Sequence, residues 1–426
     1  MKEAARLSNV VERRREYNLL MLSRAVRSFG MAIISIVLPL IVAHRGYGAG
    51  AAGFIFTAAS AGAAVLLFSA GFVGDRIGRK PVLVALAALA AITTIGFGLA
   101  DSYALLVAFA FFGALARGGG AGSGGAWGPF APVEQPLIAE VVPRATRASV
   151  LGQLSFVGVL AGALGSLAAA LPDALRGEMP MHAAEVLTMV LAGVMQLAAG
   201  VLVLGVREAP LPPRRPEQTY QLSTRAKAAI WRLSLTNALN GLGVGFLGPF
   251  LTYWLEVRYH VGAASLAGLY TLANLVTALP YLGAARLARR LGSVRAILWT
   301  RLVGAFFTAC LPLAPTFALA GLVYILRMMF QTVANPIRQS FVLDLVPAEE
   351  RGRLNAASSV PSQVTTAVSP TVGGYLMQTL GLVGLPLELA ALFQAANAVL
   401  FNAFFRHAGD PATMDRSPAR SGNQAD

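Results

Sequence analysis

The chain has 426 residues, of which 56% are hydrophobic and 13% are charged. Soluble domains carry about 25% charged residues, so this sequence has too few charges to cover a water-facing surface of its size. Its single cysteine excludes a disulfide framework, its four histidines lie too far apart for a zinc motif, and it has no GxxxxGKS/T loop for nucleotide hydrolysis. We therefore expect no metal, no cofactor and no enzymatic activity.

Twelve apolar runs follow one another along the sequence, each near the roughly 20 residues that a helix needs to cross a bilayer. This pattern predicts an all-α membrane protein with twelve transmembrane helices in two pseudo-symmetric six-helix bundles. The segment 1–16 has neither the apolar core nor the cleavage site of a secretory signal. The predicted spans are 17–43, 51–73, 82–100, 103–128, 148–171, 183–206, 229–255, 264–285, 294–313, 316–343, 355–380 and 385–405.

Basic residues in the predicted loops set the orientation, because Lys and Arg are retained on the cytoplasmic side. The loops after every second span are rich in Arg and Lys, whereas the opposite loops hold only Arg45, Arg176 and Arg258. We therefore predict an integral, multi-pass protein of the plasma membrane (the cell inner membrane) with both termini cytoplasmic. Since the net charge of +14 lies between membrane spans, we expect the lipid bilayer as a partner and no nucleic acid.

The two predicted halves resemble each other in sequence. Residues 135–143 (QPLIAEVVP) align with residues 339–347 (QSFVLDLVP), and Arg117 in span 4 aligns with Arg327 in span 10. Internal repeats of this kind are typical of secondary transporters, which bind substrate near the membrane midplane between the halves. The predicted organisation is a cytoplasmic segment 1–16, a bundle 17–206, a proline-rich cytoplasmic linker 207–228, a second bundle 229–405 and a polar cytoplasmic tail 406–426.

The second span ends in the sequence GFVGDRIGRKP, residues 71–81. Gly71 and Gly74 would let two helices approach closely, and Gly78 would permit a tight turn. The run closely resembles the GxxxDRxGR(R/K) loop signature of the major facilitator superfamily. It lies where that family carries the signature, after the second of twelve spans on the cytoplasmic side. Together with the repeat, the resemblance covers almost the whole chain and implies a secondary transporter.

By this resemblance, the motif and its partners form a conformational latch between the halves. Asp75 would face the N-terminus of helix 11, which begins near Arg353 and whose dipole could stabilise an anion by about 0.3–2 kcal/mol. Arg79 would reach Glu140, and both contacts would join the halves in the outward-open state. Alternatively, the loop charges only anchor the topology. The predicted latch residues are Gly71, Gly74, Asp75, Arg76, Gly78, Arg79, Lys80 and Glu140.

Ionisable residues within spans are costly to insert, so each is a candidate functional residue. Arg117 resembles the family's helix-4 arginine, which is often linked to proton coupling, and the glycine-rich run 118–125 follows it. Broken helices in transporters usually line cavities. Close packing against a neighbouring helix would also explain the glycines.

Glu134 is expected in the inner half of the bundle, with Arg24 and Arg27 at similar depth and Arg338 as its counterpart in the repeat. One carboxylate among several arginines stays ionised, which predicts a salt bridge that closes the cytoplasmic gate. A proton carrier and a simple interfacial charge remain alternatives.

The family's cavity-lining helices are 1, 4, 7 and 10, and their excess of positive charge here favours neutral or anionic solutes over cations. Three aromatic residues around the end of span 7, Tyr253, Trp254 and Tyr259, are expected to form an interfacial belt. The predicted cavity and coupling residues are Arg27, Arg117, Glu134, Asn237, Asn240, Arg327, Asn335 and Arg338.

The sequence therefore predicts a monomeric secondary transporter of a small organic solute that works by rocker-switch alternating access, coupled to protons and directed to export. The family's drug antiporters carry a Gly-Pro signature in helix 5. Span 5 lacks it, whereas span 11 has Ser369 and Pro370 at the matching place, which supports antiport and efflux but also fits a simple kink. Alternatives are uptake of a small metabolite, translocation of a lipid-like anion and, from another class, a non-transporting membrane sensor or scaffold.

Overall fold

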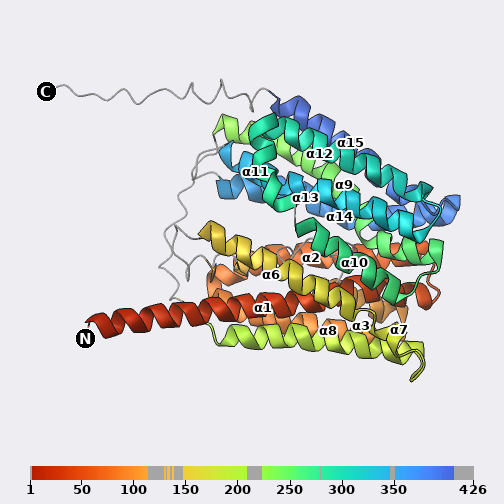
Figure 1. The fold of residues 1–426 in the computed structure, drawn as a ribbon, viewed down its shortest axis with the longest axis horizontal. Helices are drawn as coiled ribbons and strands as arrows, with labels where there is room; N and C mark the ends of the chain where they lie inside the picture. Colours follow the sequence, from red (N-terminus) through yellow and green to blue (C-terminus); the bar gives the residue numbers. More distant parts are fainter. Residues whose placement is uncertain are drawn as a thin grey trace.

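The structure is a computed structural model that describes residues 2–113, 129–130, 132–134, 137–138, 147–208, 223–278, 280–345 and 351–406. Over these ranges the chain forms helices and no strand. Figure 1 shows the helices running side by side along one axis, with the first half of the chain and the second half forming two bundles. This confirms the all-α membrane fold.

The first half is built from pairs of packed helices. Helix α1 packs against α6 and α8, and α3 packs against α4 and α8. Helix α1 begins at Lys2, so the predicted N-terminal segment continues directly into the first span. The helices of this half are α1 (Lys2–His44), α2 (Ala49–Ile77), α3 (Arg79–Leu99), α4 (Tyr103–Gly113), α6 (Arg147–Ala168), α7 (Leu171–Ala174) and α8 (Met181–Leu204).

The second half repeats this arrangement. Helix α9 packs against α14 and α15, and α12 packs against α13 and α15. Helices α10 and α11 together cover the eighth predicted span. The helices of this half are α9 (Thr224–Tyr259), α10 (Ala263–Ala278), α11 (Pro280–Leu291), α12 (Ser293–Cys310), the 3-10 helix η2 (Leu311–Leu313), α13 (Phe317–Asp344), α14 (Arg351–Leu380) and α15 (Leu385–Phe405).

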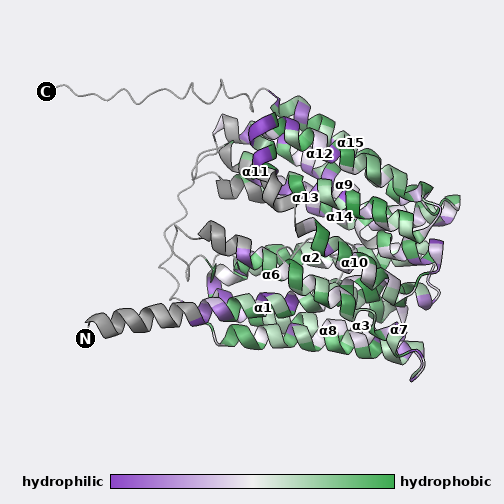
Figure 2. Ribbon diagram, in the orientation of Figure 1, coloured by the Kyte–Doolittle hydropathy of each residue, from purple (hydrophilic) through white to green (hydrophobic). Residues whose placement is uncertain are grey.

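The helices carry the apolar exterior that a bilayer requires. Eight described stretches, the first being Arg15–His44, are long and apolar enough to cross a membrane. Large apolar side chains point outward along them: Ile92 is 64% exposed and Phe306 is 63% exposed. Figure 2 shows hydrophobic residues along the length of the bundles and hydrophilic ones near the end that carries the start of α1. The count of twelve spans stays a prediction, because 114–128 and other ranges lie outside the described residues.

The two ends of the molecule differ in how the halves meet. We call the end with Ile77, Arg79 and Leu291 the basic end, and the end with His44 and Tyr259 the far end. At the far end one apolar core contains residues of both halves, from α1 and α2 as well as α9 and α10. Toward the basic end each half has a separate core. The halves are therefore joined by packing at the far end.

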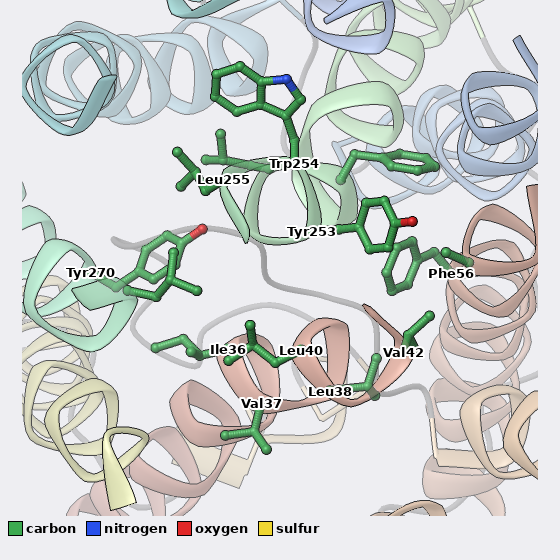
Figure 3. Close-up of a cluster of buried hydrophobic side chains, with 14 of the residues drawn as sticks. Ile36, Val37, Leu38, Leu40, Val42, Phe56, Tyr253, Trp254, Leu255 and Tyr270 are labelled. Carbon is green, nitrogen blue, oxygen red and sulfur yellow. The ribbon is translucent and has the colours of Figure 1, made fainter. Parts of the chain in front are cut away.

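Figure 3 shows this shared core, in which side chains of α1 and of Phe56 on α2 face side chains of α9 and of Tyr270 on α10. Phe56 contacts Phe250 edge to face, with ring centroids 5.6 Å apart. Thr371 on α14 donates to Thr57 on α2 through both its backbone N–H, at 3.0 Å, and its hydroxyl, at 2.7 Å. Helices α2 and α14 thus form one of the two principal contacts between the halves, and α6 and α10 form the other.

Candidate functional site

A buried ion cluster lies in the first half, where the sequence predicted it. Glu134 is 2% exposed, and its Oε2 accepts from Nη1 of Arg24 at 2.9 Å and from Nη2 of Arg27 at 2.6 Å. The guanidinium of Arg27 also lies 4.5 Å from the ring centroid of Phe130. All four residues belong to the first half, so the salt bridge does not itself join the two halves. Two cations thus share one carboxylate oxygen.

A second polar centre lies in the other half, around Arg301 on α12. Arg301 is 3% exposed, and its Nη1 donates to Oδ1 of Asn240 at 2.6 Å and to Oδ1 of Asn397 at 2.7 Å. Its Nε is buried and has no hydrogen-bond partner among the described residues. Arg338 donates to Oδ1 of Asn237, whose amide in turn donates to the carbonyl oxygen of Ser358 at 2.6 Å. Neutral amides therefore hold both arginines.

Arg327 adds a third cation to this half. It is 6% exposed, and its Nε donates to Oγ1 of Thr308 at 3.0 Å. Two buried amide atoms in the same half, Oε1 of Gln331 and Nε2 of Gln394, have no hydrogen-bond partner in the described part of the chain. A buried polar atom without a partner costs free energy unless a ligand or water satisfies it. These atoms mark a place where a polar ligand would be stabilised.

The charge balance distinguishes the halves. No carboxylate of the described side chains forms a salt bridge with Arg301, Arg327 or Arg338. In the first half, by contrast, Glu134 already occupies Arg24 and Arg27. Charges are retained inside a membrane protein only with a partner or a function. Arg301 and Arg338, whose partners Asn240 and Asn237 lie one turn apart on α9, therefore form the strongest candidate anion-binding centre. Arg327 lies about 16 Å further along α13 from Arg338 and adds positive charge to the same half.

The motif at the end of α2 folds around its last glycine. Gly78 has φ +108° and ends α2, and its N–H donates to the carbonyl oxygen of Gly74 at 3.1 Å. Glu208 then accepts from the backbone N–H of Arg79 at 2.5 Å and of Lys80 at 3.0 Å, at the N-terminus of α3. A carboxylate at this place satisfies N–H groups that the helix leaves open. The tight turn expected of Gly78 is thus confirmed, and Glu208 is a partner that the sequence did not reveal.

The other residues of the motif make only ordinary contacts or have side chains outside the described part of the chain. A Cβ at Gly71 would lie 3.5 Å from Cβ of Pro132, and one at Gly74 would lie 3.6 Å from Val133, which is ordinary contact. Arg76 is exposed and lies 3.8 Å from the ring centroid of Phe72. Asp75 lies in α2, but its side chain is outside the described part, as are Arg117 and the predicted partner Glu140. The latch therefore stays a prediction.

The predicted cavity residues fall into two groups. Arg27 and Glu134 meet in the first half, and Arg338 with Asn237 meet in the second. Asn335 is half-buried on α13. Arg301 was not among the predicted residues, although an arginine inside the apolar run 294–313 is itself a sign of function.

The expected aromatic belt is wrong for two of its three residues. Trp254 is 1% exposed and Tyr253 is 6% exposed, because this end of α9 packs into the core shared by the halves. The hydroxyl of Tyr253 donates to the carbonyl oxygen of Tyr47 at 3.3 Å. Tyr259 donates to the carbonyl oxygen of Ala314 at 2.7 Å. These rings close the far end of the interface rather than lying against lipid headgroups.

Comparisons with known proteins agree with this architecture. A profile of the Major Facilitator Superfamily matches residues 20–370 and 233–424. An uncharacterised MFS-type transporter of Mycobacterium tuberculosis is 25% identical over 357 residues, which cover 81% of this chain and 75% of the relative.

Solved structures share the fold. A bacterial homologue of the iron transporter ferroportin, in an inward-facing state, superposes with a TM-score of 0.72 at 17% identity, covering 92% of this chain and 98% of the other. A bacterial homologue of the human lysosomal transporter Spinster, inward-facing and unoccupied, gives 0.68 at 16% identity, with 96% and 99% covered. Since the profile spans most of its length, the chain belongs to the Major Facilitator Superfamily and is a multi-pass membrane transporter rather than an enzyme.

Proposed function

We propose that the protein is a monomeric secondary active transporter of the plasma membrane that moves a small organic anion by rocker-switch alternating access. The observation that carries the proposal is a set of three arginines in the second half, the buried Arg301 and Arg327 and the half-buried Arg338, which no described carboxylate neutralises. A substrate that brings one or two negative charges would supply the missing partner.

The chemistry of the centre suits a small anion with several acceptor atoms. Guanidinium groups offer a planar set of N–H donors that matches carboxylate and phosphate oxygens. The nearby amides of Gln331 and Gln394 add an acceptor and a donor without partners, which would recognise polar atoms elsewhere on the substrate. A cation would meet repulsion from three arginines in a medium of low polarity.

The conformation fits one state of an alternating-access cycle. The shared core closes the far end, whereas toward the basic end each half keeps a core of its own. With both termini in the cytoplasm, as the loop charges favour, this corresponds to a state that faces inward. In the opposite state, the predicted latch of Asp75, Arg79 and Glu140 would join the halves at the basic end.

We further propose that transport is coupled to protons and directed to export. Pro370 supports antiport because it lies in span 11 at the place that matches the helix-5 Gly-Pro signature of the family's drug antiporters. It lies within α14, the helix that contacts α2. An inward proton gradient then drives the anion outward. Export by proton antiport predicts that an acidic exterior raises the rate at which preloaded anion leaves right-side-out proteoliposomes, whereas uptake by proton symport predicts that an acidic exterior slows this loss.

Ligand binding tests the anion proposal first. The purified protein is heated with a panel of mono- and dicarboxylates, organic phosphates, neutral metabolites, organic cations and anionic lipids. A ligand at about 100 times its dissociation constant should stabilise the fold by about 2.7 kcal/mol. We expect stabilisation by small anions and its loss in Arg301→Gln and Arg338→Gln.

Arg286→Gln is the matched control, because Arg286 is exposed on α11. It removes an equal charge and should leave the response unchanged. Tight binding and transport of an organic cation would contradict the proposal. Stabilisation by anionic lipid alone would instead assign the centre to a lipid-like substrate.

A further inference from the structure

A histidine lies among carboxylates at the far end of the molecule. His44 is the last residue of α1, and its Nδ1 lies 2.5 Å from Oε1 of Glu185 on α8. Its Nε2 lies 3.9 Å from Oε1 of Glu256 on α9. Helices α1 and α8 belong to the first half and α9 to the second. The imidazole therefore stands between the two halves, with one ring nitrogen directed to each.

The burial of Glu185 favours a proton bound to the pair of His44 and Glu185. The side chain of Glu185 is 5% exposed, and His44 is the one hydrogen-bond partner that its carboxylate has in the described structure. An ionised carboxylate is costly to bury without a cation. The pair is thus stabilised by a proton that sits on the imidazole, while the 28% exposure of the His44 side chain leaves the ring open to exchange.

The other charged groups nearby do not replace that proton. Asp173, on α7, adds a further negative charge near the ring. The cation next in sequence, Arg45, is directed to the carbonyl oxygens of Ala100 and Gly98 at the end of α3. Arg258 on α9 lies over the ring of Tyr259, with 6.0 Å to the centroid.

Protonation changes what the imidazole can do toward the second half. The neutral ring donates through Nδ1 to Glu185 and presents a lone pair at Nε2 toward Glu256. The protonated ring donates through both nitrogens, so Nε2–H then faces an anion of the other half. We propose that His44, Glu185 and Glu256 form a proton-binding site between the halves, and that a bound proton stabilises the closed far end.

This inference rests on the proposed alternating access and names one site at which protons would act on it. Opening the far end separates α1 from α9 and removes Glu256 from the imidazole. The proton is therefore held more tightly in the closed state than in the open one. By linkage, one such proton changes the ratio of closed to open molecules by up to about tenfold per pH unit.

Distance measurements between the halves test the site. The full chain, with Cys310→Ser, is reconstituted in nanodiscs and spin-labelled at Glu178→Cys and Leu382→Cys near the far end. A second pair, Asn18→Cys and Ala228→Cys, reports on the basic end. Distances are recorded by electron paramagnetic resonance between about pH 5 and 8, where histidine changes its charge.

We expect the closed far-end population of the parent protein to fall as the pH rises, while the basic-end pair moves the opposite way. His44→Gln keeps an amide that can donate to Glu185 and should abolish the pH dependence, and Glu256→Gln should weaken it. His182→Gln is the matched control, because His182 is an exposed histidine at the start of α8 and should leave the response as in the parent.

Two results would overturn the inference, and they differ from a failure of the proposed function. If His44→Gln responds to pH as the parent does, or if the parent interconverts with no pH dependence, alternating access stands and the proton site falls. If both label pairs keep one fixed distance at every pH and with every anion of the ligand panel, alternating access itself is contradicted.

Discussion

The carboxylate of Asp173, in the first half, accepts a hydrogen bond at 2.8 Å from the backbone N–H of Ala264, at the N-terminus of α10 in the second half. An anion at the positive end of a helix is stabilised by about 0.3–2 kcal/mol. This is the kind of contact that the sequence predicts for Asp75 and helix 11 at the basic end. The molecule therefore holds at its far end an electrostatic contact of the type expected at the other end in the opposite state.

Replacing Asp173 should favour opening of the far end. We expect Asp173→Asn to raise the open population by a factor between about 2 and 30, which corresponds to the loss of that helix-terminus energy. Gly262→Ala should act in the same direction, because a Cβ at Gly262 would overlap Oδ2 of Asp173. Label distances at the far end measure both effects. Asp101→Asn, an exposed change of the same kind in the connection after α3 at the same end, should leave the distances unaltered.

Removing Glu134 should destabilise the first half strongly. Glu134→Gln removes the carboxylate that the buried Arg24 and Arg27 share, and breaking a buried ion pair costs about 3–5 kcal/mol. Arg24→Gln should cost less, since Glu134 keeps Arg27 at 2.6 Å. Thermal unfolding in detergent gives the comparison. If Glu134→Gln were as stable as the parent and lost only transport, the carboxylate would be a proton carrier rather than a structural counter-ion.

The glycines of the loop motif should differ in their tolerance of alanine. Gly78 has φ +108° and ψ +153°, a region that only glycine occupies readily, so Gly78→Ala should cost about 1–3 kcal/mol. Gly71→Ala should cost little, because its Cβ would meet Pro132 at an ordinary distance of 3.5 Å. Unfolding midpoints of the two variants are compared directly. Equal losses would mean that helix packing, not the turn, requires these glycines.

Asp75→Asn should slow the conformational cycle and leave substrate binding largely intact. The expected reason is that Asp75 stabilises the opposite state, in which it would lie at the N-terminus of helix 11, by about 0.3–2 kcal/mol. Exchange rates in proteoliposomes and ligand-induced thermal shifts separate the two effects. A parallel loss of binding and exchange would argue against a latch.

The sequence was most informative where a rule needed only local spacing. Gly78 between two apolar runs predicted a turn, and the structure has one with positive φ. The depth of Glu134 relative to Arg24 and Arg27 followed from counting helical turns, and the three residues meet. These relationships depend on one helix or on two neighbours within the same half.

Contacts between the two halves could not be predicted from the sequence, because local spacing does not specify how the halves meet. Hydropathy gives Trp254 and Tyr253 the same signal whether they face lipid or another helix, and here they face the other half. Glu208 reaches the start of α3 from a connection whose shape the sequence does not specify. The pairing of His44 with Glu256 joins residues more than two hundred positions apart, and no periodicity relates them.

The closest contacts between the halves are made by backbone. A Cβ at Gly53 would overlap the carbonyl oxygen of Pro370, and one at Gly374 would overlap that of Ala49. Because backbone meets backbone at these points, and Thr371 also donates to Thr57, α2 and α14 keep their contact only while both glycines lack a side chain. A methyl group at either position would have to push the two helices apart. Turnover should accordingly respond far more to Gly53→Ala or Gly374→Ala than to substitutions on the outward faces of the same two helices.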